Sequence, residues 1–241
     1  MARRSPWEAV FWTPEPLWAG QTAFLLGGGP SLAKVDLRRL SGHSVMAINS
    51  SAKPAMAAGL DEDGVLFFMD NGWWRDHRSL CEAWRGPVVT LSRAAKREAP
   101  ELVRRLDTTT PQPAFPPAGA PAVRWGRSSG HLAISLAIAM GAARIVLLGY
   151  DMRLVDGRSH HHDDYSRRTH PDVFADFLAH FEGWDGEAKA AGVEILNATP
   201  DSALTEFPMV APADILPARQ YGKRRAHRPA PNRQRRVAPA V

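Results

Sequence analysis

Short apolar runs alternate with amphipathic stretches along most of the chain. An apolar run of about 4–8 residues bounded by glycine, proline or asparagine is typical of a buried strand, and apolar residues three and four positions apart are typical of a helix. The pattern predicts strands at residues 22–26, 44–48, 65–69, 87–91, 144–148 and 193–196. It predicts helices at residues 32–40, 52–58, 92–106, about 129–140 and 172–191, and a long loop at residues 107–126.

This alternation of strands and helices predicts an α/β fold, namely a Rossmann-like, mostly parallel sheet with helices on both faces. Ligands of such sheets bind beyond the carboxyl ends of the strands. Small or polar residues follow the predicted strands, and we expect them to line one shared cleft, although loops are polar in any case. The residues concerned are Gly27 to Ser31, Asn49, Asp70, Ser128 to Gly130, Asp151 and Asn197.

Two stretches have the features of a phosphate site. The first predicted strand runs into the turn GGGPS, where glycine lets backbone N–H groups converge and a serine can cap the next helix. The second is an apolar helix that two serines cap and Gly141 ends. The turn matches neither the dinucleotide fingerprint nor the P-loop. The candidate contacts are Gly27, Gly28, Gly29, Pro30 and Ser31 at the turn and Ser128, Ser129 and Gly130 at the helix start.

Composition is that of a soluble globular protein of 241 residues, with 44% hydrophobic and 23% charged residues. No apolar stretch reaches the length of a membrane span, and the first residues lack the features of a signal peptide. Cys81 is the one cysteine, so a disulfide cannot form within the chain and we expect a cytoplasmic protein with a buried thiol.

Charge is concentrated at the carboxyl end. Residues 217–241 hold eight Lys or Arg and no acid, which leaves 22 basic and 25 acidic residues in the rest. We therefore divide the chain into an amino-terminal arm (1–19), a Rossmann-like nucleotide-binding transferase domain (20–216) and a basic disordered tail (217–241). The tail could bind nucleic acid or an acidic partner, or serve only as a solubilising terminus.

A histidine-rich segment, RSHHHDDY at residues 158–165 followed by His170, has the most reactive composition. Histidine titrates near neutral pH, so one of these side chains could be a general base for an acceptor hydroxyl. His160 and His162 lie two apart before two aspartates and could instead bind a metal, or the segment could be a solvated loop. His43, His77, His131 and His180 receive no functional role. Trp73, Trp74 and Trp84 could stack on a base but are more typical of a core.

Four features resemble two related groups of proteins, archaeal 6-hydroxymethylpterin diphosphokinase-like proteins and bacterial sialyltransferases that extend lipooligosaccharide. They are GGGPSL, the strand that ends at Asn49, the sequence from SSG through GAARIVLLGYD, and NATPDSALTEFP. Their order and spacing hold from about residue 22 to residue 208. Phage and prophage proteins share this appearance. The resemblance implies a Rossmann-like domain that binds a nucleotide phosphate donor at the glycine turn and the serine-capped helix.

The resemblance also implies roles for single residues. Asn49, and Ser129 with Gly130, match donor-binding positions of the sialyltransferases, and His170 is the closest positional match to their catalytic histidine. Gly28 stands where those enzymes carry an asparagine. Met152 and Arg153 stand where they carry tyrosines that hold the departing phosphate; Tyr150 and Tyr165 are nearby. Asp70 is similar in position to a strand-end aspartate of the pterin diphosphokinase-like proteins, where such a residue suits a Mg²⁺ ion that bridges phosphates.

Three hypotheses follow. A glycosyltransferase would use a CMP-sugar donor and a small-molecule or glycan acceptor, with His170 or His162 as the base. A diphosphokinase would transfer from Mg²⁺-ATP to a pterin-like alcohol, with Asp70 and Asp151 near the metal. A non-catalytic accessory protein would bind a nucleotide or DNA. We prefer a transferase with a nucleotide-activated donor, no tightly bound cofactor and no membrane span.

Overall fold

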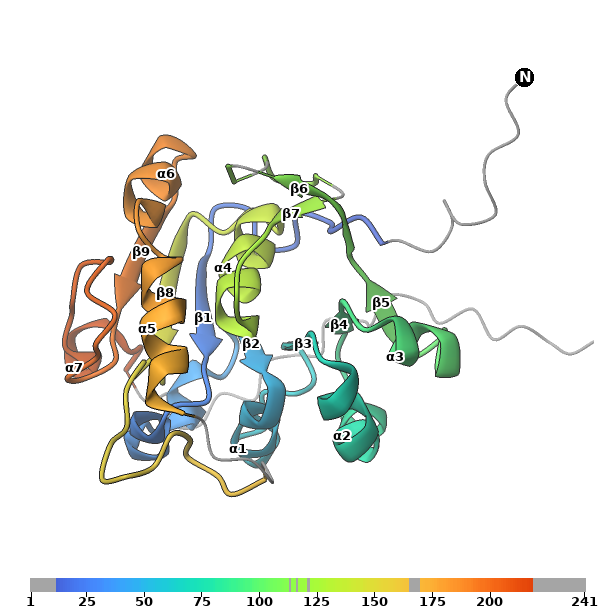
Figure 1. Cartoon of the computed structure of the whole chain (residues 1–241), viewed down its shortest axis with the longest axis horizontal. Helices are drawn as coiled ribbons and strands as arrows, with labels where there is room; N and C mark the ends of the chain where they lie inside the picture. Colours follow the sequence, from blue (N-terminus) through green and yellow to red (C-terminus); the bar gives the residue numbers. More distant parts are fainter. Residues whose placement is uncertain (1–11, 113, 116, 121, 165–169, 219–241) are drawn as a thin grey trace, which may run out of the picture.

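The computed structural model describes residues 12–112, 114–115, 117–120, 122–164 and 170–218. Within them, seven strands form one parallel sheet in the order β5-β4-β3-β2-β1-β8-β9. The strands are β1 (Thr22–Leu26), β2 (Ser44–Ile48), β3 (Val65–Phe68), β4 (Val88–Thr90), β5 (Val103–Arg105), β8 (Arg144–Leu148) and β9 (Glu194–Asn197). The strand order reverses between β1 and β8, and helices lie on both faces, so the predicted Rossmann-like fold is confirmed (Figure 1).

The sheet lies between two hydrophobic cores. Successive side chains of a strand point to opposite faces, so Leu25 enters one core while Phe24 and Leu26 enter the other. Because both faces of the central strands are covered, they read as continuous apolar runs rather than as alternating ones. This is why the predicted bounds of β1, β2 and β8 agree with the structure.

Helices fall into two layers. On one face lie α4 (Ser129–Ala139), α5 (Pro171–Ala179) and α6 (Trp184–Ala190), and on the other lie α1 (Ala52–Ala57), α2 (Asn71–Ala83), α3 (Arg93–Glu98) and α7 (Pro212–Ile215). The longest described α-helix, α2, has 13 residues, and no helix in the described part combines the length and apolar character that a bilayer crossing needs.

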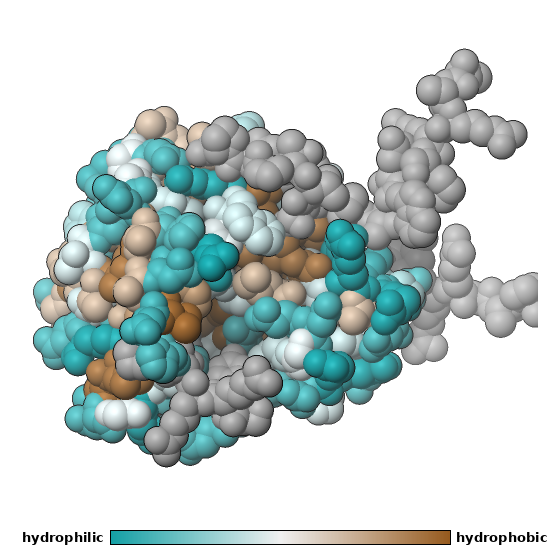
Figure 2. All heavy atoms as spheres, viewed as in Figure 1, coloured by the Kyte–Doolittle hydropathy of each residue, from teal (hydrophilic) through white to brown (hydrophobic). Residues whose placement is uncertain are grey.

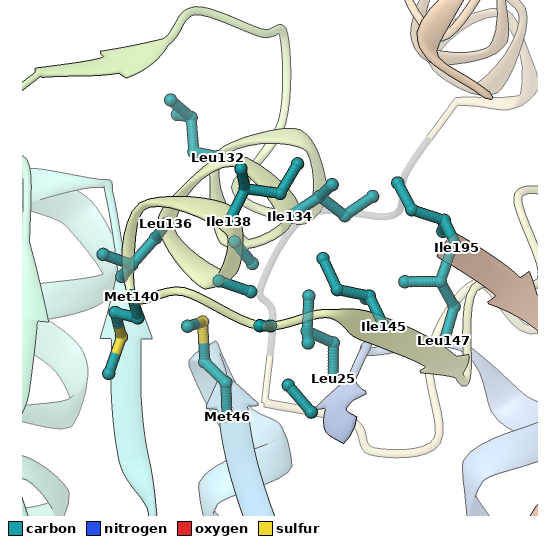
Figure 3. Close-up of a cluster of buried hydrophobic side chains, with 14 of the residues drawn as sticks. Leu25, Met46, Leu132, Ile134, Leu136, Ile138, Met140, Ile145, Leu147 and Ile195 are labelled. Atoms are coloured by element: carbon teal, nitrogen blue, oxygen red, sulfur yellow. The ribbon is translucent and has the colours of Figure 1, made fainter. Parts of the chain in front are cut away.

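Helix α4 packs at the centre of the first core. Ten of its eleven residues are buried, so it is apolar on almost every side. Figure 3 shows its side chains among those of the strands beneath it. The labelled residues are Leu25, Met46, Leu132, Ile134, Leu136, Ile138, Met140, Ile145, Leu147 and Ile195.

Three predicted helices are wrong in extent. The helix at residues 92–106 ends at Glu98, because Pro100 disfavours a helical conformation at Ala99 (φ −143°), and strand β5 follows. The helix at residues 172–191 is broken by Gly183, whose φ of +80° separates α5 from α6. Residues 32–40 form two 3₁₀ turns, η2 (Pro30–Lys34) and η3 (Leu37–Leu40), rather than one helix.

The predicted loop at residues 107–126 is also wrong in part. It contains two short strands, β6 (Asp107–Gln112) and β7 (Ala122–Arg124), which pair in parallel as a second small sheet. Three consecutive threonines, which are β-branched, favour extended backbone in β6. The prediction gave more weight to the prolines nearby, which are typical of loops.

The first and last segments that the structure describes are both hydrogen-bonded to the body of the domain. The Trp18 N–H donates to the Met140 carbonyl at 2.9 Å, and the Trp18 side chain is buried. At the other end, the Arg39 guanidinium donates to the carbonyls of Leu216 and Pro217, each at 2.7 Å. Residues 1–11 and 219–241 lie outside the described part, so the roles predicted for most of the arm and the basic tail stay predictions.

Truncation of a central core side chain tests this arrangement. Leu147 lies on β8 with an exposed fraction of 0%. Replacing it by alanine (Leu147→Ala) removes buried methyl groups and leaves a cavity, so we expect the free energy of unfolding in urea to fall by about 2–5 kcal/mol. Leu17→Ala, at a side chain 46% exposed, should change it by about 0.5 kcal/mol or less. Equal effects of the two substitutions would contradict the assigned core.

Candidate functional site

A cavity of about 540 Å³ opens at the carboxyl ends of β1, β2, β3 and β8, where the strand order reverses. Sheets of this type bind ligands at this point. Figure 2 shows this face of the molecule hollowed near its centre. The predicted site residues that line the cavity are Gly27, Gly28, Gly29, Asn49, Asp70, Ser128, Ser129, Gly130, Asp151 and His162. The sequence also predicted Pro30, Ser31, His170 and Asn197 for the cleft or its chemistry. These four are not among the described residues that line the cavity.

The glycine turn packs against the end of β8. The N–H groups of Gly27 and Gly29 donate to the carbonyls of Leu148 and Gly149, each at 2.8 Å. A Cβ on Gly27 would lie 2.5 Å from the Gly149 oxygen, and one on Gly29 would lie 1.9 Å from Asp151 Oδ2. Two of the three glycines are therefore required by close packing between strand ends. Their N–H groups are already used, so they do not converge on a phosphate as predicted.

Asp151 fastens this turn from the end of β8. Its carboxylate accepts hydrogen bonds from the Ser31 N–H at 3.2 Å and from the Ser31 hydroxyl at 2.7 Å. Burial raises the pKa of Asp151, and the two hydrogen bonds from Ser31 oppose that rise. Ser31 therefore donates to a carboxylate instead of contacting a ligand. Asp151, predicted to be catalytic, is engaged in holding the turn.

The start of α4 forms the second wall of the cavity. Ser128 caps the helix by accepting the His131 N–H at 3.4 Å, and Ser129 and Gly130 begin its first turn. The Tyr150 hydroxyl donates to the Gly130 carbonyl at 3.2 Å, and a Cβ on Gly130 would lie 3.0 Å from the Tyr150 ring. Burial raises the pKa of Tyr150, so its phenol stays neutral. A side chain at position 130 would therefore press on the ring of Tyr150.

Asn49 connects the end of β2 to α4. Its backbone has a φ of +54°, a left-handed conformation that asparagine tolerates better than most residues. Its side-chain amide donates to the Ser129 hydroxyl at 3.3 Å. Its Oδ1 atom is buried and accepts no hydrogen bond within the described part of the chain. Buried acceptors of this kind are uncommon, and in a cavity wall they suit a ligand donor.

His131 supports the same helix start and was missed by sequence reasoning. Its Nδ1 lies 2.8 Å from the Ser128 hydroxyl, and its ring stacks on Phe181 with centroids 3.6 Å apart. Burial, followed by the nearby His180, lowers the pKa of His131 to about 3, so the ring is neutral. A histidine inside an apolar helix carries no local signal of this role, because its partners come from α5 and the segment that follows it.

The histidine-rich segment forms part of the cavity wall. The His161 N–H donates to the Gly28 carbonyl at 3.0 Å, and Lys53 pairs with Asp164 at 2.6 Å. Of the three consecutive histidines, His160 and His162 line the cavity. Burial, and then the neighbouring histidines, lower the pKa of each of these two to about 4, so both are neutral at pH 7.

His170 and Asn197 lie elsewhere. His170 caps α5, where its Nδ1 accepts the Asp172 backbone N–H at 3.4 Å, and its side chain is 73% exposed. Asn197 is fully buried, where its amide donates to the Leu204 carbonyl and accepts the Thr199 N–H, so it shapes a turn. Tyr165 lies outside the described residues. No group of three or more His, Cys, Asp or Glu among the described residues is placed to hold a metal ion.

Helix α2 forms the wall opposite α4. Asp70 precedes its first turn, Asp76 lies further along it, and both line the cavity. Burial raises the pKa of Asp70, and its carboxylate accepts no hydrogen bond within the described residues. Between them Trp73 stacks on His77 with centroids 4.8 Å apart and donates to the Ser50 hydroxyl at 3.2 Å. Trp74 and Trp84 are core residues, as favoured by the sequence.

The cavity is therefore polarised between its two ends. The α4 end presents the first N–H groups of a helix, whose dipole favours negative charge, and Arg127 at its rim is a cation that pairs with Asp176 at 3.0 Å. The α2 end presents two carboxylates and the face of Trp73, and α5 contributes the apolar side chains of Phe174 and Phe177. An anionic group suits the first end, and a group with hydroxyls or amines suits the second.

Comparison with models of known protein families finds no match to this chain, and comparison with curated proteins finds none either. Similar solved structures include the sialyltransferase CstII from Campylobacter jejuni with the substrate analogue cytidine-5'-monophosphate. This chain and that structure are 14% identical in sequence, with a TM-score of 0.48, and the match covers 80% of this chain and 86% of the CstII chain. Another is the sialyltransferase CST-II with a trisaccharide acceptor and CMP, with 15% identity, a TM-score of 0.47 and coverage of 80% and 86%.

The packing of the glycine turn gives a first prediction for the site. Gly29→Ala places a Cβ where Asp151 Oδ2 now lies, so we expect a loss of about 1–3 kcal/mol in the free energy of unfolding in urea. Gly186→Ala is the control, because nothing lies within 4 Å of its added Cβ and alanine favours the helix that contains it. If the two variants had the same free energy of unfolding, the close approach of Gly29 to Asp151 would be contradicted.

The burial of the neutral His131 ring gives a second prediction, on how stability depends on pH. Between pH 6.5, the ordinary pKa of histidine, and the folded pKa of about 3, the unfolded chain binds a proton at His131 that the native chain does not. Stability therefore falls as the pH drops below 6.5. Relative to His131→Phe, wild-type stability in urea should fall by about 2 kcal/mol between pH 7 and pH 5. His180→Phe, at a side chain 45% exposed, is the control. Parallel pH curves for wild type and His131→Phe would contradict a buried neutral ring.

Proposed function

We propose that this chain is a transferase that binds a nucleotide-activated donor in the cavity and passes its activated group to a hydroxyl-bearing acceptor. One observation carries this proposal: the start of α4, the buried Oδ1 of Asn49 and the unpartnered carboxylate of Asp70 line the same cavity at the point where the strand order reverses. A donor anion, its nucleoside and an acceptor hydroxyl would each find a matching group there.

The donor phosphate fits the start of α4. Ser129 and Gly130 occupy the first turn of an eleven-residue helix, where backbone N–H groups have no partner inside the helix. Arg127 lies at the rim, where it pairs with Asp176 and could turn its remaining N–H groups to a phosphate. Asn49 Oδ1, which is buried at the end of β2, can accept a hydrogen bond from a hydroxyl or amino group of the nucleoside.

The acceptor fits the α2 end, beside Asp70 and Asp76. In the transfer, the bond between the activated group and the donor phosphate breaks, and its electron pair stays on the phosphate oxygen. The acceptor oxygen forms the new bond and loses its proton to a base. We assign that base to Asp70, because its carboxylate lines the cavity and its raised pKa makes it a better proton acceptor than an ordinary aspartate. His170, the base favoured by the sequence, caps α5 and is not among the described residues that line the cavity.

A metal-dependent diphosphokinase is the second candidate, and the pair of cavity carboxylates favours it. Mg²⁺ is commonly held by one or two carboxylates together with substrate phosphates, and Asp70 and Asp76 would supply them. The ion would neutralise charge on the phosphates of ATP. Asp151 also lines the cavity, but each of its two oxygens already accepts a hydrogen bond from Ser31, so we assign the ion to Asp70 and Asp76.

A binding panel tests the proposed function. We expect CMP, UMP, AMP, GMP or ATP, titrated with and without Mg²⁺, to raise the melting temperature, since a ligand that binds only the native state stabilises it by about 2.7 kcal/mol at 100 times its Kd. A shift without metal supports transfer from a nucleotide-activated group, and a shift with ATP that requires Mg²⁺ supports the diphosphokinase.

Ser129→Asp is the matched variant for this panel. A carboxylate at the start of α4 interacts favourably with the helix dipole, which offsets part of the cost of burying it, so the unliganded variant should remain folded with a melting temperature that can be measured. The same charge repels a phosphate, so the nucleotide-induced shift should disappear. A nucleotide shift that Ser129→Asp leaves unchanged, or no shift with any nucleotide, would refute the proposed site.

A further inference from the structure

Backbone conformation distinguishes one residue of the cavity wall. Among the described non-glycine residues, those with a positive φ are Asn49 (+54°), Met152 (+51°), Asp156 (+50°) and Asp201 (+53°). Asparagine and aspartate enter this left-handed region several times more often than most residues, because their short polar side chains can hydrogen-bond locally. Methionine has no such compensation. Met152 is therefore the residue of this set whose side chain does not favour the conformation it adopts.

Both neighbours of Met152 are fixed, which explains how the chain keeps this conformation. Asp151 precedes it, is anchored through its carboxylate, and accepts the Ala203 N–H at its backbone carbonyl at 2.9 Å. Arg153 follows it and donates from Nε to the Asp201 carbonyl at 2.7 Å. An unfavourable backbone conformation persists where the surroundings determine it in this way, and residues of this kind gather at ligand sites.

The Met152 side chain belongs to an apolar part of the cavity wall. It is half-buried, lines the cavity, and packs at the edge of the first core. Helix α5 contributes Val173, Phe174 and Phe177 to the lining of the same cavity. These four side chains carry no charge and no hydrogen-bonding N–H or O–H group. The wall formed by α5 and the segment after β8 therefore suits an apolar or aromatic part of a ligand.

The position of this wall decides which part of a donor it would meet. Strand β3 leads to Asp70 and strand β8 leads to Met152, and β2 and β1 lie between them in the sheet (Figure 1). Neighbouring strands are about 4.8 Å apart, so these two strand ends are separated by about 14 Å. In a nucleotide-activated donor the phosphate lies between the nucleoside and the group that is transferred. With the phosphate at α4 and the transferred group facing Asp70, the base lies toward Met152.

We infer that Met152 is held in its left-handed conformation so that its thioether packs against the nucleobase of the donor. This role rests on the proposed function and adds a specificity residue to it. Glycine would adopt the same φ without steric cost, so the methionine side chain has a reason to be present other than the turn. A thioether is flexible and polarizable and makes favourable contacts with aromatic rings, which is the kind of surface that a base presents.

Substitutions at position 152 separate the side chain from the backbone. Met152→Ala and Met152→Gly both remove the thioether, but only glycine relieves the backbone, so Met152→Gly should melt about 2–4 °C above Met152→Ala. Met152→Leu keeps an apolar side chain of similar volume. Asp156→Ala and Asp156→Gly form the matched control pair, because Asp156 has nearly the same φ but is exposed and is not among the described residues that line the cavity.

The experiment is calorimetric titration with the nucleoside monophosphate that wild type binds most tightly among CMP, UMP, AMP and GMP, and displacement of that ligand by ribose 5-phosphate, which lacks the base. We expect Met152→Ala and Met152→Gly to weaken the monophosphate about 5-fold to 30-fold and Met152→Leu to stay within about 3-fold of wild type. The affinity for ribose 5-phosphate should change by about 2-fold or less in all three. Both Asp156 variants should bind both ligands like wild type.

Four results would overturn the inference. If Met152→Ala and Met152→Gly bind the monophosphate like wild type, the side chain serves only the core. If they weaken ribose 5-phosphate as much as the monophosphate, Met152 does not act through the base. If Met152→Ala melts as high as Met152→Gly, the conformation has no cost that a ligand contact must explain. If wild type itself binds no nucleotide, the proposed function fails and the inference with it, which distinguishes that outcome from the first three.

Discussion

The buried carboxylate of Asp151 is the contact on which the site depends. It accepts two hydrogen bonds from Ser31 and so fixes the turn after β1 to the end of β8, the two strands between which the strand order reverses. A buried carboxylate without partners would cost several kcal/mol, so the turn and the strand end can only be stable together. Gly29 is needed because the carboxylate lies where its Cβ would be. The geometry of the cavity floor follows from this single pairing.

The rest of the site is built outward from that floor by side chains that are themselves held from behind. Tyr150 follows Gly149 and supports Gly130, and His131 supports Ser128 from within the core. On the other side, His161 is bonded to Gly28. A ligand would therefore meet groups whose orientation is already fixed before it binds, which reduces the entropy lost on binding.

The sequence predicted the sheet well and the site unevenly, for physical reasons. β1, β2 and β8 are buried on both faces, so their apolar runs are unambiguous, whereas the break at Gly183 and the strand β5 depend on tertiary context. Glycine and serine at strand ends located the cavity correctly because such residues mark close backbone approach. Their partners could not be read locally: the contact between Ser31 and Asp151 spans 120 residues, and the role of His131 depends on residues of another helix.

The histidines show most clearly why residue type alone does not assign chemistry. A histidine near neutral pH can be a base or a metal ligand, and the sequence left both roles open for His162, beside that of a solvated loop. Burial in the cavity wall lowers its pKa to about 4, and its Nδ1 accepts a backbone N–H, so the ring is neutral at pH 7. At the opposite end of the cavity, burial raises the pKa of Asp70, which strengthens it as a proton acceptor. The same desolvation therefore weakens histidine as a base and strengthens aspartate, which is the reason why our proposal assigns the base to Asp70 on the α2 side of the cavity.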